Sequence, residues 1–138
     1  MDVLTNNDIE FFDKETELIL VISDDGRVAY AYLLGAEDQI LGDVWLYNHI
    51  PTPASPEWTD SENMPFANSA DYVRTDIKVE LPVYQNDVSV RWLDRNGRRV
   101  AQIFFAENLF AELTEGAKPG WCRMAKKDGP VAKVLEKE

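Results

Sequence analysis

The chain has 138 residues, a formal net charge of −11 and a sequence pI near 4.5. Its length suits one domain, and its 45% of hydrophobic residues argue for a packed core and against a disordered chain. Because an acidic field of this size repels phosphate groups, nucleic acid and anionic membranes are excluded as expected partners.

The charge is divided unevenly along the chain. Residues 1–70 contain 14 acidic residues but only Lys14 and Arg27 as bases, which gives 2 − 14 = −12. Residues 71–138 contain 11 acidic and 12 basic residues, which gives 12 − 11 = +1. Such a field speeds the encounter with a basic partner, although acidity also serves simply to keep a protein soluble.

Targeting and cross-linking signals are not evident in the sequence. The longest apolar run, residues 18–22, is far shorter than the about 20 residues that cross a bilayer. The N-terminal stretch lacks the basic and apolar regions of a signal peptide. Cys122 is the only cysteine, so the chain forms no internal disulfide. We therefore expect a cytoplasmic protein with a single domain over residues 1–138.

The first part of the chain predicts an antiparallel meander. Residues 17–23, 27–34 and 40–48 are rich in β-branched and aromatic side chains, and turn-forming residues separate them. Residues 7–15 fit either a strand or a short helix, and Asn7 as an N-terminal cap favours the helix.

A proline-rich loop follows over residues 48–70. Its prolines lack the backbone N–H that a strand ladder needs, and they stand at Pro51, Pro53, Pro56 and Pro65. A stretch of about 20 residues without regular structure is unusual in a compact domain. We therefore expect this loop to be functional or to pack as an irregular lid.

The next segments also predict strands. Residues 71–81 alternate apolar and polar side chains, as in a strand with one face in solvent. Residues 87–93 and 99–105 flank the sequence "DRNG", where Gly97 suits the positive φ of a tight hairpin turn.

The last segments are mixed. Residues 108–116 predict a helix, with Asn108 as its N-terminal cap and Gly116 just beyond its end. Residues 121–136 suggest a short hairpin or an extended tail. The expected fold is therefore mostly β (α+β), an antiparallel sheet or sandwich of about six to eight strands with one or two short helices.

The sequence carries no catalytic signature. His49 and Cys122 are the only residues of their types, and Cys122 has no recognisable nucleophile context. A structural zinc site needs about four Cys or His ligands, which this chain lacks. Acidic pairs such as Asp24 and Asp25 lie in predicted turns, where local hydrogen bonding favours Asp. We therefore expect no enzyme activity, no catalytic or metal-binding residue and no cofactor.

The strand over residues 40–48 presents an acidic and aromatic face. Asp43, Trp45 and Tyr47 are two residues apart, so they are expected to point to one side. One interpretation is that the loop covers these aromatics as a second small core, with Asp43 paired to Arg27. The other is an exposed docking surface, because Trp and Tyr are favoured at interface centres and acids recognise basic partners. The residues expected to bind the partner are then Asp24, Asp25, Asp43, Trp45, Tyr47, Trp58, Asp60 and Glu62.

Two stretches carry a resemblance to a known class of protein. They are "GDVWLYN" followed by the proline-rich loop, and "KPGWCRMAKKDGPVAKVL" near the C-terminus. In a small acidic β-rich chain they resemble bacterial immunity proteins of polymorphic-toxin and contact-dependent-inhibition systems. The resemblance implies a protein that binds a cognate toxin and blocks it, and the acidic first half suits a basic toxin such as a nuclease. It transfers no site residues.

Three other functions remain open from the residues. A small-ligand-binding β-barrel or sandwich would use the loop over residues 48–70 as a lid over Tyr30, Tyr32 and Trp45. An enzyme built on acidic residues would need a carboxyl group with a raised pKa in a cleft. A structural or adaptor domain would use its acidity only for solubility.

Overall fold

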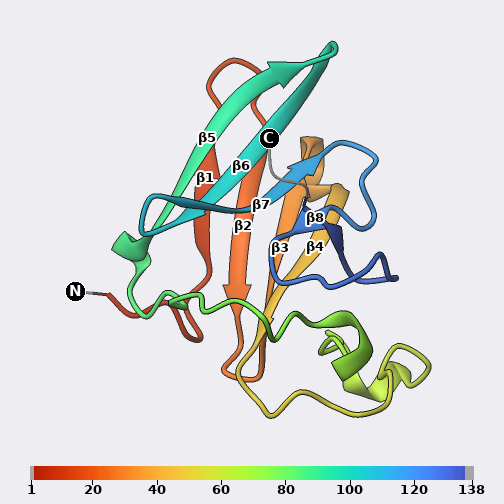
Figure 1. Ribbon diagram of the computed structural model, residues 1–138. Helices are drawn as coiled ribbons and strands as arrows, with labels where there is room; N and C mark the ends of the chain where they lie inside the picture. Colours follow the sequence, from red (N-terminus) through yellow and green to blue (C-terminus); the bar gives the residue numbers. More distant parts are fainter. Residues whose placement is uncertain (1, 136–138) are drawn as a thin grey trace.

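The structure, a computed structural model, describes residues 2–135 (Figure 1). Within these residues it has nine strands in two sheets, joined by loops and short 3-10 turns, and it has no α-helix. The mostly β class predicted from the sequence is confirmed, and the strand number is somewhat higher than expected.

The first sheet is an antiparallel meander in the order β1-β2-β3-β4. Its strands are β1 (Ile9–Phe12), β2 (Ile19–Asp24), β3 (Val28–Leu34) and β4 (Ile40–Asn48). The three predicted strands are confirmed. The helix favoured over residues 7–15 is wrong, because Ile9 and Phe11 alternate with exposed neighbours and pair with Ile22 and Leu20.

The second sheet has the order β5-β6-β7-β8-β9. Its strands are β5 (Val88–Arg95), β6 (Arg98–Phe105), β7 (Asn108–Thr114), β8 (Trp121–Cys122) and β9 (Lys133–Val134). The predicted hairpin at "DRNG" is confirmed, with Asn96 and Gly97 both at positive φ. The C-terminal segment is not a hairpin, because β8 and β9 pair in parallel.

The helix predicted over residues 108–116 is wrong. Ala106 and Glu107 both have positive φ and form a two-residue turn, so Asn108 pairs with Phe105 and starts β7 instead of capping a helix. The side chains of β7 from Phe110 onward are all buried, on both faces of the strand. Neighbouring strands and covering segments therefore override the helical spacing of the leucines.

The strand predicted over residues 71–81 is also wrong. Val73 forms an isolated bridge to Ala125, and the chain from residue 75 to residue 82 joins neither sheet. The alternation is nevertheless real, because Ile77, Val79 and Leu81 are half-buried while the residues between them are exposed. The alternation of apolar and polar residues along the sequence indicates which side chains are buried. A strand also needs the edge of a neighbouring strand to pair with.

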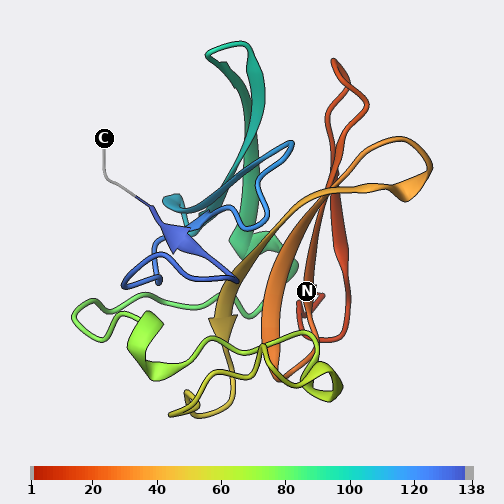
Figure 2. The same cartoon turned by 90° about the vertical axis from the view of Figure 1, so that its right-hand side faces the viewer.

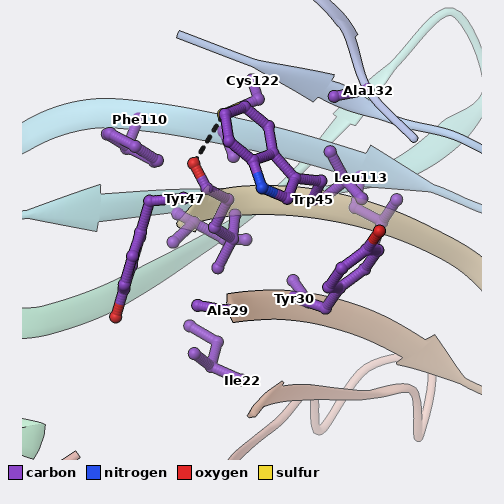
Figure 3. Close-up of a cluster of buried hydrophobic side chains, with 14 of the residues drawn as sticks. Ile22, Ala29, Tyr30, Trp45, Tyr47, Phe110, Leu113, Cys122 and Ala132 are labelled. Carbon is purple, nitrogen blue, oxygen red and sulfur yellow. Dashed lines mark hydrogen bonds between the residues drawn. The ribbon is translucent and has the colours of Figure 1, made fainter. Parts of the chain in front are cut away.

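The core lies between the two sheets, which pack with β3 and β4 against β7 (Figures 1 and 2). Figure 3 shows side chains of both sheets meeting there. Fully buried members include Leu20, Ile22, Leu33, Val44, Ile103, Phe110 and Leu113.

The C-terminal half closes the far edge of β4. The main chain of Asp43 bonds to Ala117 and Gly120, and the N–H of Trp45 donates to the carbonyl of Val131 at 2.8 Å. This close approach explains Gly120, because a Cβ there would lie 2.6 Å from the carbonyl oxygen of Glu112. The first sheet is therefore open only at β1.

Candidate functional site

The proline-rich loop packs over the lower part of the first sheet. Arg27 pairs with Glu57 of the loop and donates to the carbonyl of Pro65 at 2.8 Å. Tyr30 donates its hydroxyl hydrogen to the carbonyl of Phe66 at 2.6 Å. The loop therefore covers this part of the sheet, and Arg27 pairs with Glu57 instead of the expected Asp43.

The expectation that Trp45 and Tyr47 share one exposed face is wrong. Their side chains are buried, and they point away from each other (Figure 3). The cause is a β-bulge, since Trp45 pairs with Tyr30 while Tyr47 pairs with the adjacent Ala29. The extra residue, Leu46, shifts the alternation, so the two aromatic rings lie on opposite sides of the strand.

Asp24 is likewise buried rather than free to meet a partner. Its Oδ2 accepts a hydrogen bond from the Tyr47 hydroxyl at 2.6 Å and lies 2.7 Å from Nε2 of His49. Its Oδ1 accepts from the N–H of Gly26 at 2.9 Å. Asp24 is therefore a structural acceptor that joins β2 to the end of β4.

The other predicted binding residues are at least partly accessible, and they lie on the β2–β3 turn, the proline-rich loop and β4. Asp25 is exposed and accepts from the main chain of its own turn, and Trp58 packs edge-on against Tyr72 with ring centroids 5.1 Å apart. Asp60 and Glu62 are exposed on a short 3-10 turn, where Asp60 accepts from the N–H of Glu62. Asp43 is half-buried on β4.

A different surface combines apolar, aromatic and acidic side chains. On the solvent side of the first sheet, the strand registers place eight side chains in two rows across all four strands. We call this surface the outer face. Its first row is Phe12, Ile19, Leu34 and Ile40, and its second row is Glu10, Val21, Tyr32 and Asp43.

The outer face is left uncovered above the loop. Phe12 is 56% exposed and Ile40 is 47% exposed, and the apolar side chains between them are half-buried. An antiparallel sheet normally turns polar side chains to water, so a contiguous apolar row on the solvent side is unusual.

Acidic groups surround the centre of the outer face. The pKa of Tyr32 is raised, first by burial and then by the negative charges of Asp43, Asp25 and Asp8. The pKa of Asp43 is raised above 3.8 because burial disfavours its charged form, and the positive charge of Lys118 offsets this only in part. Among the described residues, Asp43 and Glu10 form no ion pair within 4.0 Å.

Sequence reasoning identified Asp43 as a binding residue and named Tyr32 as a residue under the loop in the ligand-binding alternative, but it missed the remaining members of the outer face. The signal was present in "ELILVIS", where Ile19 and Val21 alternate with Leu20 and Ile22. Because every residue in this run except its ends is apolar, the periodicity does not distinguish the core side from a solvent side that is also apolar.

The geometry gives no support for a Cys–His pair. Cys122 is fully buried, and its thiol donates to the carbonyl of Leu46 at 3.3 Å (Figure 3). Burial raises the pKa of this thiol to about 12, so the nucleophilic thiolate is disfavoured. His49 instead contacts Asp24.

Residues 2–135 lack both a metal-binding cluster and a membrane-spanning helix. These residues contain no group of three or more His, Cys, Asp or Glu side chains placed to hold a metal ion. They also contain no helix with the length and apolar character that crossing a membrane requires. Comparison of the chain with protein-family models, curated protein sequences and solved structures gave no match.

Proposed function

We propose that this chain is a non-enzymatic binding protein that captures a basic protein on its outer face. The supporting observation is the contiguous apolar surface around Tyr32 and Val21, bordered by the carboxylates of Glu10 and Asp43. Apolar side chains at the centre of such a surface provide binding energy by leaving water. Acidic side chains at its border select the partner by charge.

The role that fits this surface is that of an immunity protein. In that role the partner is a cognate toxin with a basic active surface, of which nucleases are one class. A nuclease must attract a polyanion, so its substrate site is basic and complementary to an acidic inhibitor. Binding to the outer face would cover that site and exclude the substrate.

The half-buried carboxylate of Asp43 suits a charged partner. Burial already penalises its negative charge, as its raised pKa reflects. A partner Arg or Lys placed beside it would form a charge-assisted hydrogen bond in a site shielded from water. Such a contact is stronger than the same contact on an open surface, where exposed ion pairs contribute about 0–1 kcal/mol.

The test begins with recovery of the partner from cells that produce the protein, with mass spectrometry to identify it. Association rates with the purified partner are then measured for Glu10→Lys/Asp43→Lys and for the matched loop variant Asp60→Lys/Glu62→Lys. We expect the outer-face variant to associate at least about tenfold more slowly at low salt, and the difference to shrink at high salt.

The loop variant changes net charge by the same amount, so it controls for a general loss of electrostatic attraction between the protein and its partner. Slower association of the outer-face variant alone would support the proposal. An equal slowing of both variants, an effect confined to the loop variant, or recovery of only acidic or neutral partners would overturn it.

A further inference from the structure

One extended segment of the chain crosses the base of the molecule without pairing its backbone with a neighbouring strand. We call residues 75–82 the strap. Within the described residues, no hydrogen bond joins the backbone of residues 77–82 to another backbone group or to a side chain. Both of its ends are fixed, since Arg74 N–H donates to the carbonyl of Met124 at 2.8 Å and Leu4 N–H donates to that of Val83 at 2.9 Å.

The strap nevertheless has the side-chain arrangement of a strand. From Ile77 to Leu81 the residues alternate between half-buried and exposed, as they do in an edge strand. Its main-chain donors and acceptors are thus left for water or for another polypeptide. An extended segment with unpaired backbone groups is the structure to which a partner strand adds.

Hollows lie on more than one side of the strap. A groove of about 450 Å³ is lined by every residue from Ile77 to Leu81. The rest of its lining is mainly apolar and includes Trp45, Tyr47, Val73 and Met124. A second hollow of about 250 Å³ is lined by Lys78, Val79 and Glu80 together with Phe105, Phe110 and Arg123.

The charge around the strap is opposite to that of the molecule as a whole. The charged side chains that line these two hollows and a third one beside Arg74 are four bases and two acids: Arg74, Lys78, Arg123, Lys126, Asp76 and Glu80. Asp76 is already held by Arg74, with bonds at 2.9 and 2.7 Å. Lys78, Arg123 and Lys126 therefore exceed the remaining acid, Glu80, in a chain whose net charge is −11.

We propose that the strap is a second binding site, which takes an extended segment of another protein with alternating apolar and acidic side chains. The segment would pair its backbone with residues 77–81, place apolar side chains in the groove beside Val73 and Met124, and turn its acids towards Lys78 and Arg123. This site is separate from the outer face and takes a partner of opposite charge, so it does not depend on the function proposed above.

The probe is a blocked peptide of alternating Val and Glu, about nine residues long, which spans the strap with some excess. Its matched control replaces every Glu by Lys. Amide chemical shifts of the strap are recorded by NMR during titration to about 1 mM peptide, which detects weak binding. We expect the Glu peptide to shift the amides of residues 77–81 and the Lys peptide to bind at least about tenfold more weakly.

Backbone pairing is tested by N-methylation of alternate amides of the peptide. Only one edge of an extended peptide faces the strap, so methylation along one edge should abolish binding and methylation along the other edge should spare it. In the protein, Lys78→Pro removes one strap donor without breaking a native hydrogen bond, and Lys78→Ala removes the same side chain but keeps the donor. We expect Lys78→Ala to bind the peptide more weakly than wild type because it loses one charge, and Lys78→Pro to bind it clearly more weakly still, while the melting temperatures of the two variants stay close.

Three results would overturn the proposal. They are the absence of strap shifts with the Glu peptide, equal binding of peptides methylated along either edge, and strap amides that are already strongly protected from hydrogen exchange in the free protein. The last measurement needs no ligand, and it examines the unpaired backbone directly.

Discussion

Arg99 of β6 holds the carboxylate of Asp13 with two parallel hydrogen bonds, from Nε to Oδ2 at 2.7 Å and from Nη2 to Oδ1 at 3.1 Å. Asp13 directly follows β1 and Arg99 lies at the start of β6, so this pair connects the β1–β2 hairpin of one sheet to the β5–β6 hairpin of the other. Asp13 is only 4% exposed, and Thr16 also donates to it at 2.6 Å.

Arg99→Ala should lower the free energy of unfolding by about 3 kcal/mol, because it leaves a buried carboxylate without its cation. Urea denaturation measures the change. The matched control is Arg98→Ala, since Arg98 is the exposed neighbour and, within residues 2–135, its side chain donates only to the carbonyl of Glu115. Its expected effect is about 0.5 kcal/mol or less. Equal losses in both variants would contradict the structural role of the Arg99–Asp13 pair.

Acid should weaken the same connection. Hydrogen bonding from the Arg99 guanidinium, against the opposing effect of burial, holds the pKa of Asp13 below 3.8. The stabilisation from this shift is fully present above the unfolded-state pKa and is lost as pH falls through the lower folded-state pKa. The stability difference between wild type and Asp13→Asn should therefore be constant near neutral pH and shrink below about pH 4. Urea denaturation of both proteins across this pH range measures the stability difference. A difference that stays constant down to pH 2 would contradict the predicted role of the lowered Asp13 pKa.

The hydroxyl of Tyr47 should contribute to the stability of the fold through its hydrogen bond to Asp24. Tyr47→Phe removes one of the donors to the buried carboxylate of Asp24 while it keeps the packing of the ring against Phe105. We expect a loss of about 1–3 kcal/mol, because a buried charged acceptor loses a partner. Tyr84→Phe, at a partly exposed position outside the core cluster, is the control and should be near neutral. Thermal unfolding of both variants provides the comparison.

Asp43 is expected to oppose stability while it serves binding. Because burial raises its pKa above 3.8, the folded state binds protons more readily than the unfolded state, and stability from this group declines as pH rises through the folded-state pKa. Asp43→Asn should thus leave stability at pH 7 unchanged or raise it by about 0.5 kcal/mol or less, while it weakens binding of a basic partner. Thermal unfolding and partner affinity are measured on the same preparation. A clear loss of stability would show that the carboxylate has a structural role.

Cys122 should not react in the native protein. Its thiol is fully buried and its pKa is raised to about 12, so labelling by a thiol reagent at pH 8 must wait for opening of the structure. The labelling rate should rise with urea in step with unfolding. Fast labelling in the absence of denaturant would contradict the burial of Cys122 of β8 against β4.

The strands most readily predicted from the sequence were those whose partners are close in the chain. The meander from β2 to β4 and the hairpin with Asn96 and Gly97 combine local turns with apolar strands, so the short-range pattern was sufficient. β7 was missed because its identity depends on the positive φ of Ala106 and Glu107, which are not residues that usually signal such a turn.

The candidate site was harder to predict for a similar reason. The bulge at Leu46 separates Trp45 from Tyr47, and nothing in "VWLYN" marks it. The outer face depends on registers among all four strands of the first sheet, and these registers bring Phe12 and Ile40 into one row. Sequence periodicity gives the direction of a side chain within its own strand, but not its neighbours across the sheet.

The hydrogen bond from Leu4 to Val83 affects how the chain folds while it is being synthesised from its N-terminus. A nascent chain that has emerged only as far as β4 holds the whole first sheet, yet it lacks every strand that covers the inner side of that sheet and the carbonyl that Leu4 requires. Such an intermediate exposes Leu20, Ile22 and Val44 to water and to its neighbours on the ribosome. Two polypeptides divided between Tyr72 and Val88 should therefore be insoluble apart and should reconstitute one folded protein when they are synthesised together.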